Sequence, residues 1–167
     1  MKLPPFNTFP TLNSNRITLR QIQTADILDI IEISFYDAVQ ASTLKEATEM
    51  LERINEDYQH GNSIHWGISD NSSGKIVGTC GYYRGFDEGA GELGCILLPL
   101  FRGKGLMTIA LQVAIDFGLK HIRLRRIWAA TSKENHKAQI MLDRLNFIKL
   151  QDMPGEEIEY ELRRKHN

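Results

Sequence analysis

The sequence is short of cysteine, of long apolar runs and of net charge, and each shortage excludes a class of protein. Its two cysteines, Cys80 and Cys95, are too few for the disulfide framework of a small secreted domain, and their spacing matches no metal-ligand motif. No apolar stretch approaches the roughly 20 residues that cross a bilayer, and residues 1–6 lack the continuous apolar segment of a secretory signal. We therefore expect a cytoplasmic protein with no metal and no membrane partner.

Positive and negative side chains nearly balance, with 20 lysines and arginines against 21 aspartates and glutamates, for a net charge of −1. This balance gives no general attraction toward nucleic acid, so we expect no nucleic-acid partner. The chain has 167 residues, an ordinary length for one domain, and no linker or internal repeat divides it. We predict a single domain over residues 1–167.

The spacing of apolar residues predicts an α+β fold with about seven strands and about four helices. The predicted strands are residues 16–22, 64–69, 75–84, 91–98, 126–131, 147–150 and 158–162. The predicted helices are residues 24–38, 43–58, 106–117 and 138–145. Turn-forming residues separate the second, third and fourth strands, which indicates antiparallel neighbours. The helix between 91–98 and 126–131 indicates that these two strands are parallel, so the sheet is mixed but mostly antiparallel.

The segment Arg102-Gly103-Lys104-Gly105 joins a predicted strand to a predicted helix. Glycine allows left-handed backbone angles and close approach of a ligand, and the first amides of the following helix favour an anion. This pattern predicts a phosphate-binding loop, with a plain strand-to-helix turn as the alternative. The Lys-Ser/Thr pair of a mononucleotide loop and the third glycine of a dinucleotide fingerprint are both missing.

Four motifs in order resemble those of the GNAT N-acetyltransferases, in the branch of the RimJ/RimL-type ribosomal-protein N-terminal acetyltransferases. They are Gly78-Thr79-Cys80-Gly81, Gly91-Glu92-Leu93-Gly94-Cys95, the glycine loop continuing to Met107, and Asn135-His136-Lys137-Ala138 followed by Leu145-Asn146-Phe147. The resemblance covers nearly the whole chain. It implies the GNAT fold, in which two central strands splay apart to form a coenzyme cleft.

The resemblance also implies acetyl-CoA as cosubstrate and an amine acceptor. The pyrophosphate is expected to bind the backbone amides of the loop, and the pantetheine arm is expected to lie along a strand edge. An asparagine is expected to donate one hydrogen bond to the coenzyme, with helix capping as its alternative role. The residues expected to bind the coenzyme are Ile96, Leu97, Leu98, Arg102, Gly103, Lys104, Gly105, Leu106, Met107 and Asn135.

Acetylation of an amine needs a base, because an ammonium group must lose a proton before it attacks the thioester. Glu92 is our catalytic candidate, since it is the only carboxylate in the predicted strand 91–98; a cross-strand salt bridge is the alternative. The general acid is not evident. Relatives carry a tyrosine or a serine where this chain has Leu142 and Ala138. Candidate substitutes, each of which also suits a packing role, are Tyr82, Tyr83 and Cys80.

The sequence says least about the identity of the amine acceptor. We expect direct transfer to a primary amine, with a protein N-terminus as one candidate, a polyamine, amino sugar or antibiotic as another, and a non-catalytic coenzyme-binding module as the third possibility. Acidic residues that would attract a cationic amine are Asp37, Asp57, Asp87 and Glu88. We expect His60 and His65 at turns or on the surface. The basic run 120–126 fits a solvated helix end or a partner contact, and the chain is expected to be a monomer or homodimer.

Overall fold

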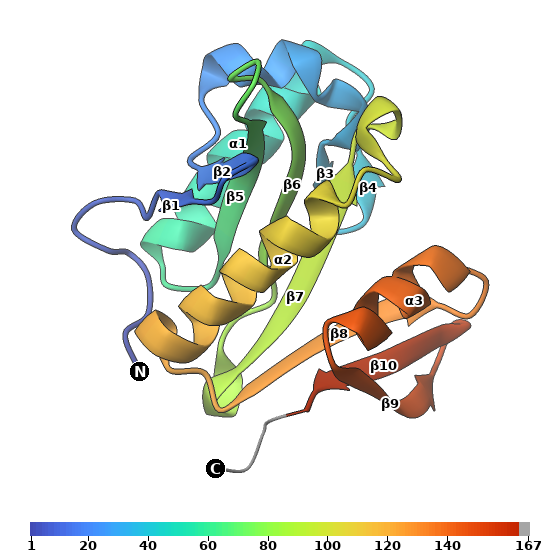
Figure 1. Ribbon diagram of the computed structural model, residues 1–167. Coiled ribbons are helices and arrows are strands. Elements are labelled where there is room, and N and C mark those ends of the chain that lie inside the picture. Colours follow the sequence, from blue (N-terminus) through green and yellow to red (C-terminus); the bar gives the residue numbers. More distant parts are fainter. Residues whose placement is uncertain (164–167) are drawn as a thin grey trace.

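The computed structural model of the protein describes residues 1–163, which form one mixed sheet with helices on both faces (Figure 1). The sheet has eight strands in the order β1-β2-β5-β6-β7-β8-β10-β9, and every neighbouring pair is antiparallel except β7 and β8. The strands are β1 (Leu12–Asn13), β2 (Ile17–Arg20), β5 (Ile64–Asp70), β6 (Ile76–Tyr82), β7 (Ala90–Leu97), β8 (Arg126–Ser132), β9 (Phe147–Met153) and β10 (Glu157–Leu162).

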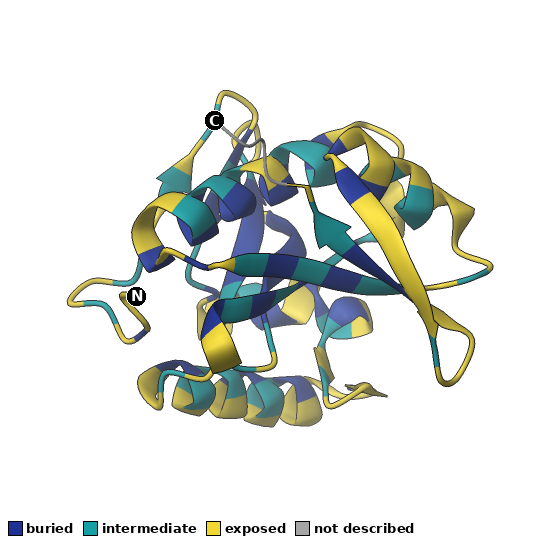
Figure 2. Ribbon diagram, turned by 90° about the horizontal axis from the view of Figure 1, so that it is seen from below, coloured by how far each residue is buried: buried dark blue, intermediate teal, exposed yellow. Residues whose placement is uncertain are grey.

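Helices α2 (Leu106–Phe117) and α3 (His136–Arg144) cover one face of the sheet, and α1 (Leu44–Gln59) covers the other (Figure 2). A short π-helical turn, Gly118–Ile122, continues α2. The short 3-10 turns are η1 (Thr24–Asp29), η2 (Ile31–Ile33), η3 (Asp87–Gly89) and η4 (Pro99–Phe101). No helix within residues 1–163 has both the length and the apolar character needed to span a membrane.

Alternation of side chains along β5, β6 and β7 builds a separate core on each face. The core under α2 contains Trp66, Tyr82 and Leu93, whereas the core under α1 includes Ile76 with Ile96 and Leu98 packed against it. The even-numbered residues of β7 therefore face α1 and its odd-numbered residues face α2. The phase matters for function, because it decides which side chains share a cavity.

The predicted helix over residues 24–38 is wrong. The chain instead makes the two 3-10 turns η1 and η2 and then a small hairpin of β3 (Phe35–Tyr36) and β4 (Val39–Gln40). Four isoleucines occupy this segment, and β-branched side chains lower helix propensity by restricting the first side-chain torsion. The carboxylate of Asp26 holds the first turn, since it accepts a hydrogen bond from the Gln23 amide and pairs with Arg20.

The central strands β7 and β8 separate after a short parallel contact, as expected for the GNAT fold. Their register covers only three pairs, from Ala90–Arg126 to Glu92–Trp128. On its other side β7 stays paired with β6 as far as Leu97–Gly78. The two strands diverge visibly from their starting point in Figure 1. The second half of β7 therefore has one edge without a β8 partner.

Candidate functional site

The free edge of β7 offers backbone groups at every second residue. The Leu98 amide donates to the carbonyl of Val77, and the Tyr83 amide donates to the carbonyl of Glu92, so even-numbered residues direct their backbone groups toward β6. By the alternation of a strand, Leu93, Cys95 and Leu97 direct theirs into the gap between β7 and β8. Of the predicted coenzyme residues Ile96, Leu97 and Leu98, Leu97 thus presents its backbone to the cleft, while Ile96 and Leu98 pack on the α1 side.

The glycine loop lies between the end of β7 and the start of α2. Gly103 and Gly105 have φ angles of 75° and 76°, and a Cβ at either would find no atom of residues 1–163 within 4 Å. The space beside both glycines is open, and the first amides of α2, which lack partners within the helix, lie next to it. The Arg102 Nε donates to the carbonyl of Leu97 at 3.1 Å, and Arg16 donates to the carbonyl of Lys104 at 3.0 Å. The residues present fit a phosphate group.

Asn135 occupies the N-cap position of α3. Its side-chain oxygen accepts a hydrogen bond from the Ala138 amide at 3.1 Å, which is the capping role named as the alternative. The Nδ2 group takes no part in that bond. Leu142, further along the helix, is buried in the core that α2 and α3 share. This position of α3 therefore supplies no proton donor.

Glu92 combines burial with an oxygen that makes no hydrogen bond in the described part of the chain. Its side chain is only 12% exposed, and within residues 1–163 its Oε2 is the sole buried side-chain nitrogen or oxygen that lacks a hydrogen-bond partner. The Nε of Arg84 lies 3.4 Å away, but Arg84 is 73% exposed. Burial raises the pKa of Glu92 above its ordinary value, the nearby charge of Glu157 adds to the rise, and Arg84 opposes it. A carboxylate in this state is suited to exchange a proton.

A cavity of about 530 Å³ opens on the α1 face of the sheet. It lies between the β3–β4 hairpin, α1, and strands β5 to β7. Its polar lining is provided by Tyr36, Asp37, Asp57, Ser63, His65, Thr79, Tyr83 and Arg84. The Tyr36 hydroxyl donates to Asp57 at 2.9 Å. Two of the four acidic candidates for the acceptor, Asp37 and Asp57, therefore lie at this cavity.

His65 was expected on the surface or in a turn, and that expectation is wrong. It lies in β5 with its ring stacked on Tyr83, the ring centroids being 4.8 Å apart. Burial lowers the pKa of His65 to about 4, so the imidazole is neutral at physiological pH. The position between Ile64 and Trp66 was the available signal, because all three belong to one predicted strand.

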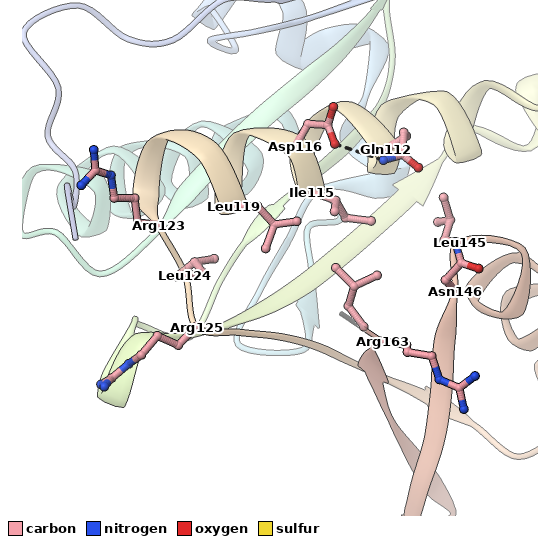
Figure 3. Close-up of a pocket in the computed structure, with 11 residues that line it drawn as sticks. Gln112, Ile115, Asp116, Leu119, Arg123, Leu124, Arg125, Leu145, Asn146 and Arg163 are labelled. Atoms are coloured by element: carbon pink, nitrogen blue, oxygen red, sulfur yellow. Dashed lines mark hydrogen bonds between the residues drawn. The ribbon is translucent and has the colours of Figure 1, made fainter. Parts of the chain in front are cut away.

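A second cavity, of about 610 Å³, lies on the opposite face, between α2, the start of β8 and the end of β10 (Figure 3). Its floor is aliphatic, with Ile115, Leu119 and Leu145 on it, and Figure 3 shows Arg123 and Arg125 directed away from its centre. It contains none of the residues that were predicted to bind the coenzyme or to act in catalysis.

Three cations of the basic run make structural contacts, and the remaining acidic candidates lie away from the cavity on the α1 face. Lys120 pairs with Asp116, Arg125 donates to the carbonyl of Glu88, and Arg126 pairs with two glutamates of β10. Asp87 and Glu88 belong to η3 and do not line the cavity on the α1 face. Within residues 1–163, no group of three or more histidine, cysteine, aspartate or glutamate side chains is placed to hold a metal.

Comparison with known proteins decides the family. The model of the acetyltransferase (GNAT) domain matches residues 16–148, which include the splayed strands, the glycine loop and Glu92. The chain belongs to the GNAT acetyltransferases. An N-acetyltransferase from Bacillus licheniformis, named p20 and uncharacterized, is 29% identical over 147 residues, 83% of each chain.

Solved GNAT structures share this fold. Ribosomal-protein-S5-alanine acetyltransferase from Vibrio fischeri superposes with a TM-score of 0.74 at 24% identity, over 91% of this chain and 95% of that one. Spermidine N-acetyltransferase from Vibrio cholerae, in its dodecameric structure, superposes with a TM-score of 0.71 at 17% identity, over 89% and 92%. These two neighbours acetylate a protein and a polyamine, so the shared fold leaves the acceptor of this GNAT protein open.

Proposed function

We propose that this protein transfers the acetyl group of acetyl-CoA directly to a primary amine, with Glu92 as the general base. The observation that carries the proposal is the buried Oε2 of Glu92, which has no hydrogen-bond partner within residues 1–163 and lies next to Arg84, a residue that lines the cavity on the α1 face. Buried polar atoms are nearly always hydrogen-bonded, and one that is not calls for a missing partner. A substrate ammonium, or a water between it and Glu92, supplies that partner and gives up a proton before attack.

The coenzyme is proposed to bind along the glycine loop and the free edge of β7. Backbone amides from Arg102 to Met107 would hold the pyrophosphate, and Lys104 would add positive charge. Leu97, whose backbone faces the cleft, would bond the pantetheine arm as a neighbouring strand would. Arg102 donates to the Leu97 carbonyl, whose second lone pair is available to a coenzyme amide. The Nδ2 group of Asn135 is the proposed additional donor.

Transfer in one step, without an acyl-enzyme, fits the state of the two cysteines. Cys80 and Cys95 lie opposite each other on β6 and β7, and both are free thiols. Burial raises the pKa of Cys95 to about 12 and also raises that of Cys80. Since the thiolate is the nucleophilic form, neither cysteine is activated at neutral pH.

The first acceptor candidate is a protein N-terminus, and the lining of the cavity favours a polyamine as the second. Asp37 and Asp57 provide negative charge at the end of the cavity formed by the β3–β4 hairpin. A molecule with a second ammonium group beyond the reacting one would interact with both carboxylates, whereas the uncharged backbone of a peptide would not.

The test is a thiol-release assay with acetyl-CoA and a panel of amines. Peptides with N-terminal alanine or serine, spermidine, and an amino sugar form three arms, and mass spectrometry of each product locates the acetyl group. Release of CoA that depends on one amine supports the proposal and names the acceptor class. Binding of acetyl-CoA without turnover on any arm would leave the non-catalytic coenzyme-binding module as the function.

A further inference from the structure

The reaction needs a proton donor for the departing sulfur, and α3 supplies none. The positions at which relatives carry tyrosine or serine are here Leu142, which is buried in the core, and Ala138, whose amide is bound by the N-cap. The proton can come from water or from a hydroxyl of another element that faces the cavity on the α1 face. Tyr82 is excluded, because its hydroxyl donates to the carbonyl of Ala114 on the opposite face of the sheet.

Tyr83 follows β6 and turns its ring back over the sheet. The ring lies against Gly94 of β7, where a Cβ would come within 2.5 Å of the ring atoms Cε2 and Cδ2. Gly81 is paired with both Gly94 and His65, and the ring of Tyr83 stacks on that of His65. The two glycines and the imidazole of His65 thus leave space for the phenol ring of Tyr83. A side chain at position 94 would occupy that space.

Tyr83 lines the cavity on the α1 face together with Thr79 and Ile96. Thr79 is near enough to affect the acidity of the Tyr83 hydroxyl, and it is paired with Ile96 in the register of β6 and β7. At its other end Tyr83 is paired with Glu92 through its own backbone amide. The ring therefore lies against β7 at Gly94, between the proposed base and the segment Ile96–Leu98, on the face that lines the cavity.

We propose that Tyr83 is the catalytic residue that donates a proton to the coenzyme thiolate as it departs. The inference rests on the proposed function. Glu92 first takes one proton from the acceptor ammonium and releases it to solvent. The neutral nitrogen then forms a bond to the acetyl carbon, and its second proton passes to Glu92. As the carbon–sulfur bond breaks, the Tyr83 proton passes to sulfur, giving free CoA and the acetylated amine. The proton on Glu92 then returns to Tyr83, which restores both residues.

Burial raises the pKa of Tyr83 most, and the nearby Cys80, Cys95 and Glu92 add to the rise whereas Thr79 opposes it, so the phenol carries its proton at neutral pH. The other tyrosine that lines the cavity, Tyr36, is not available as the acid, because its hydroxyl already donates a hydrogen bond to Asp57. Thr79 is a weaker acid than a phenol and fits better as the partner of Tyr83.

The experiment compares Tyr83→Phe with the matched control Tyr82→Phe in the full-length protein. We expect Tyr83→Phe to lower kcat by about 10²-fold, a typical loss of one acid–base group, with acetyl-CoA affinity unchanged. Tyr82→Phe should lower the melting temperature and leave kcat unaltered. The decisive measurement uses the selenium analogue of acetyl-CoA. A selenolate leaves with less need for a proton, so the defect of Tyr83→Phe should shrink at least tenfold, whereas a structural defect would be equal for both donors.

A 3-fluorotyrosine at position 83 keeps the ring and hydroxyl and makes the phenol more acidic, so it should retain at least the wild-type kcat, even if Tyr83→Phe folds poorly. A kcat for Tyr83→Phe within threefold of wild type, or an equal loss with sulfur and selenium donors, would overturn the assignment. These outcomes leave the proposed function intact. The proposed function fails separately, if the wild-type protein acetylates no amine.

Discussion

Two large cavities formed by residues 1–163 lie on opposite faces of one sheet and differ in what lines them. The larger, of about 610 Å³, has an aliphatic floor, and the arginines at its edge turn outward (Figure 3). The smaller, of about 530 Å³, gathers Asp57, His65, Tyr83 and Arg84, and Glu92 lies beside it. Volume therefore does not identify the site. A group of polar side chains with shifted pKa values is the better indicator of a site, because catalysis requires such side chains and packing does not.

The most severe test of this comparison is Glu92→Gln. Loss of a general base should lower kcat by about 10²–10⁴-fold at neutral pH and leave acetyl-CoA affinity unchanged. The defect should shrink as the pH rises toward the pKa of the acceptor amine, where the amine loses its proton unaided. A pH series of initial rates checks this, and a defect of constant size across the series would remove Glu92 from the mechanism.

Stability separates this role from a structural one. Burial raises the pKa of Glu92, so the folded state disfavours its charge, and the free energy of unfolding falls as the pH rises through the raised pKa. Glutamine carries no such cost. At pH 7 and above the variant should melt no lower than the wild type, and below pH 4 the two should coincide. A structural salt bridge predicts a lower melting temperature at neutral pH.

The next effect concerns the glycine loop, on the α2 face. Gly105→Ala places a Cβ in the open space beside the loop and should weaken acetyl-CoA binding about tenfold, or about 1.4 kcal/mol. Gly74→Ala is the matched control, since Gly74 also has a positive φ, 70°, and open space around it. Both variants lose about 1 kcal/mol of stability to left-handed strain. Calorimetric titration should show weaker binding in Gly105→Ala alone, and equal affinities would contradict the loop assignment.

A matched pair of enlarging substitutions contrasts the cavities directly. Ile54→Phe intrudes on the cavity of the α1 face and should raise the KM of the amine about fivefold. Leu119→Phe makes a comparable intrusion into the cavity of the α2 face and should leave kcat and KM unchanged. Steady-state kinetics with the acceptor identified above provide the measurement. If Leu119→Phe raised the KM and Ile54→Phe did not, the assignment of the two cavities would be reversed.

The smallest expected effect is that of Arg84→Ala. Arg84 lowers the pKa of Glu92, so its removal should raise that pKa and move the acidic limb of the pH–kcat profile to higher pH. The shift should be modest because Arg84 is 73% exposed and its charge is screened by solvent. High salt should reproduce the shift in the wild type and have less influence on the variant. An acidic limb that moves to lower pH would contradict this assignment.

Local patterns sufficed for seven of the eight strands of the sheet, though not for β1, and for the position of the glycine loop. The strands β5, β6 and β7 and the parallel placement of β8 followed from alternation and from the length of the connecting helix, and the loop was predicted from two glycines at the start of α2. The segment 24–38 failed because isoleucines at helical spacing also fit 3-10 turns. The acceptor side could not be predicted, since the cavity forms where the β3–β4 hairpin, α1 and three strands meet.

Tyr83 illustrates what a sequence conceals. Its identity was available, but its direction depends on Gly94 across the sheet and on His65, which the sequence suggested for the surface. Asn135 shows the opposite case, because its capping bond is local and was foreseen as the alternative to coenzyme binding. Whether a tyrosine packs in the core or lines a site depends on its neighbours across the sheet, and the residue type alone does not show it.

The divergence of β7 from β8 after only three residue pairs bears on the proposed order of events in turnover. The proposed coenzyme loop follows β7, and the proposed amine cavity lies on the α1 face, so the proposed reaction gives each substrate a place of its own. Both substrates would then be bound at once, and we expect double-reciprocal plots of rate to intersect rather than run parallel, unlike the ping-pong pattern of an acyl-enzyme. We also expect the acetylated amine to leave while CoA remains bound, so that CoA is a competitive product inhibitor toward acetyl-CoA.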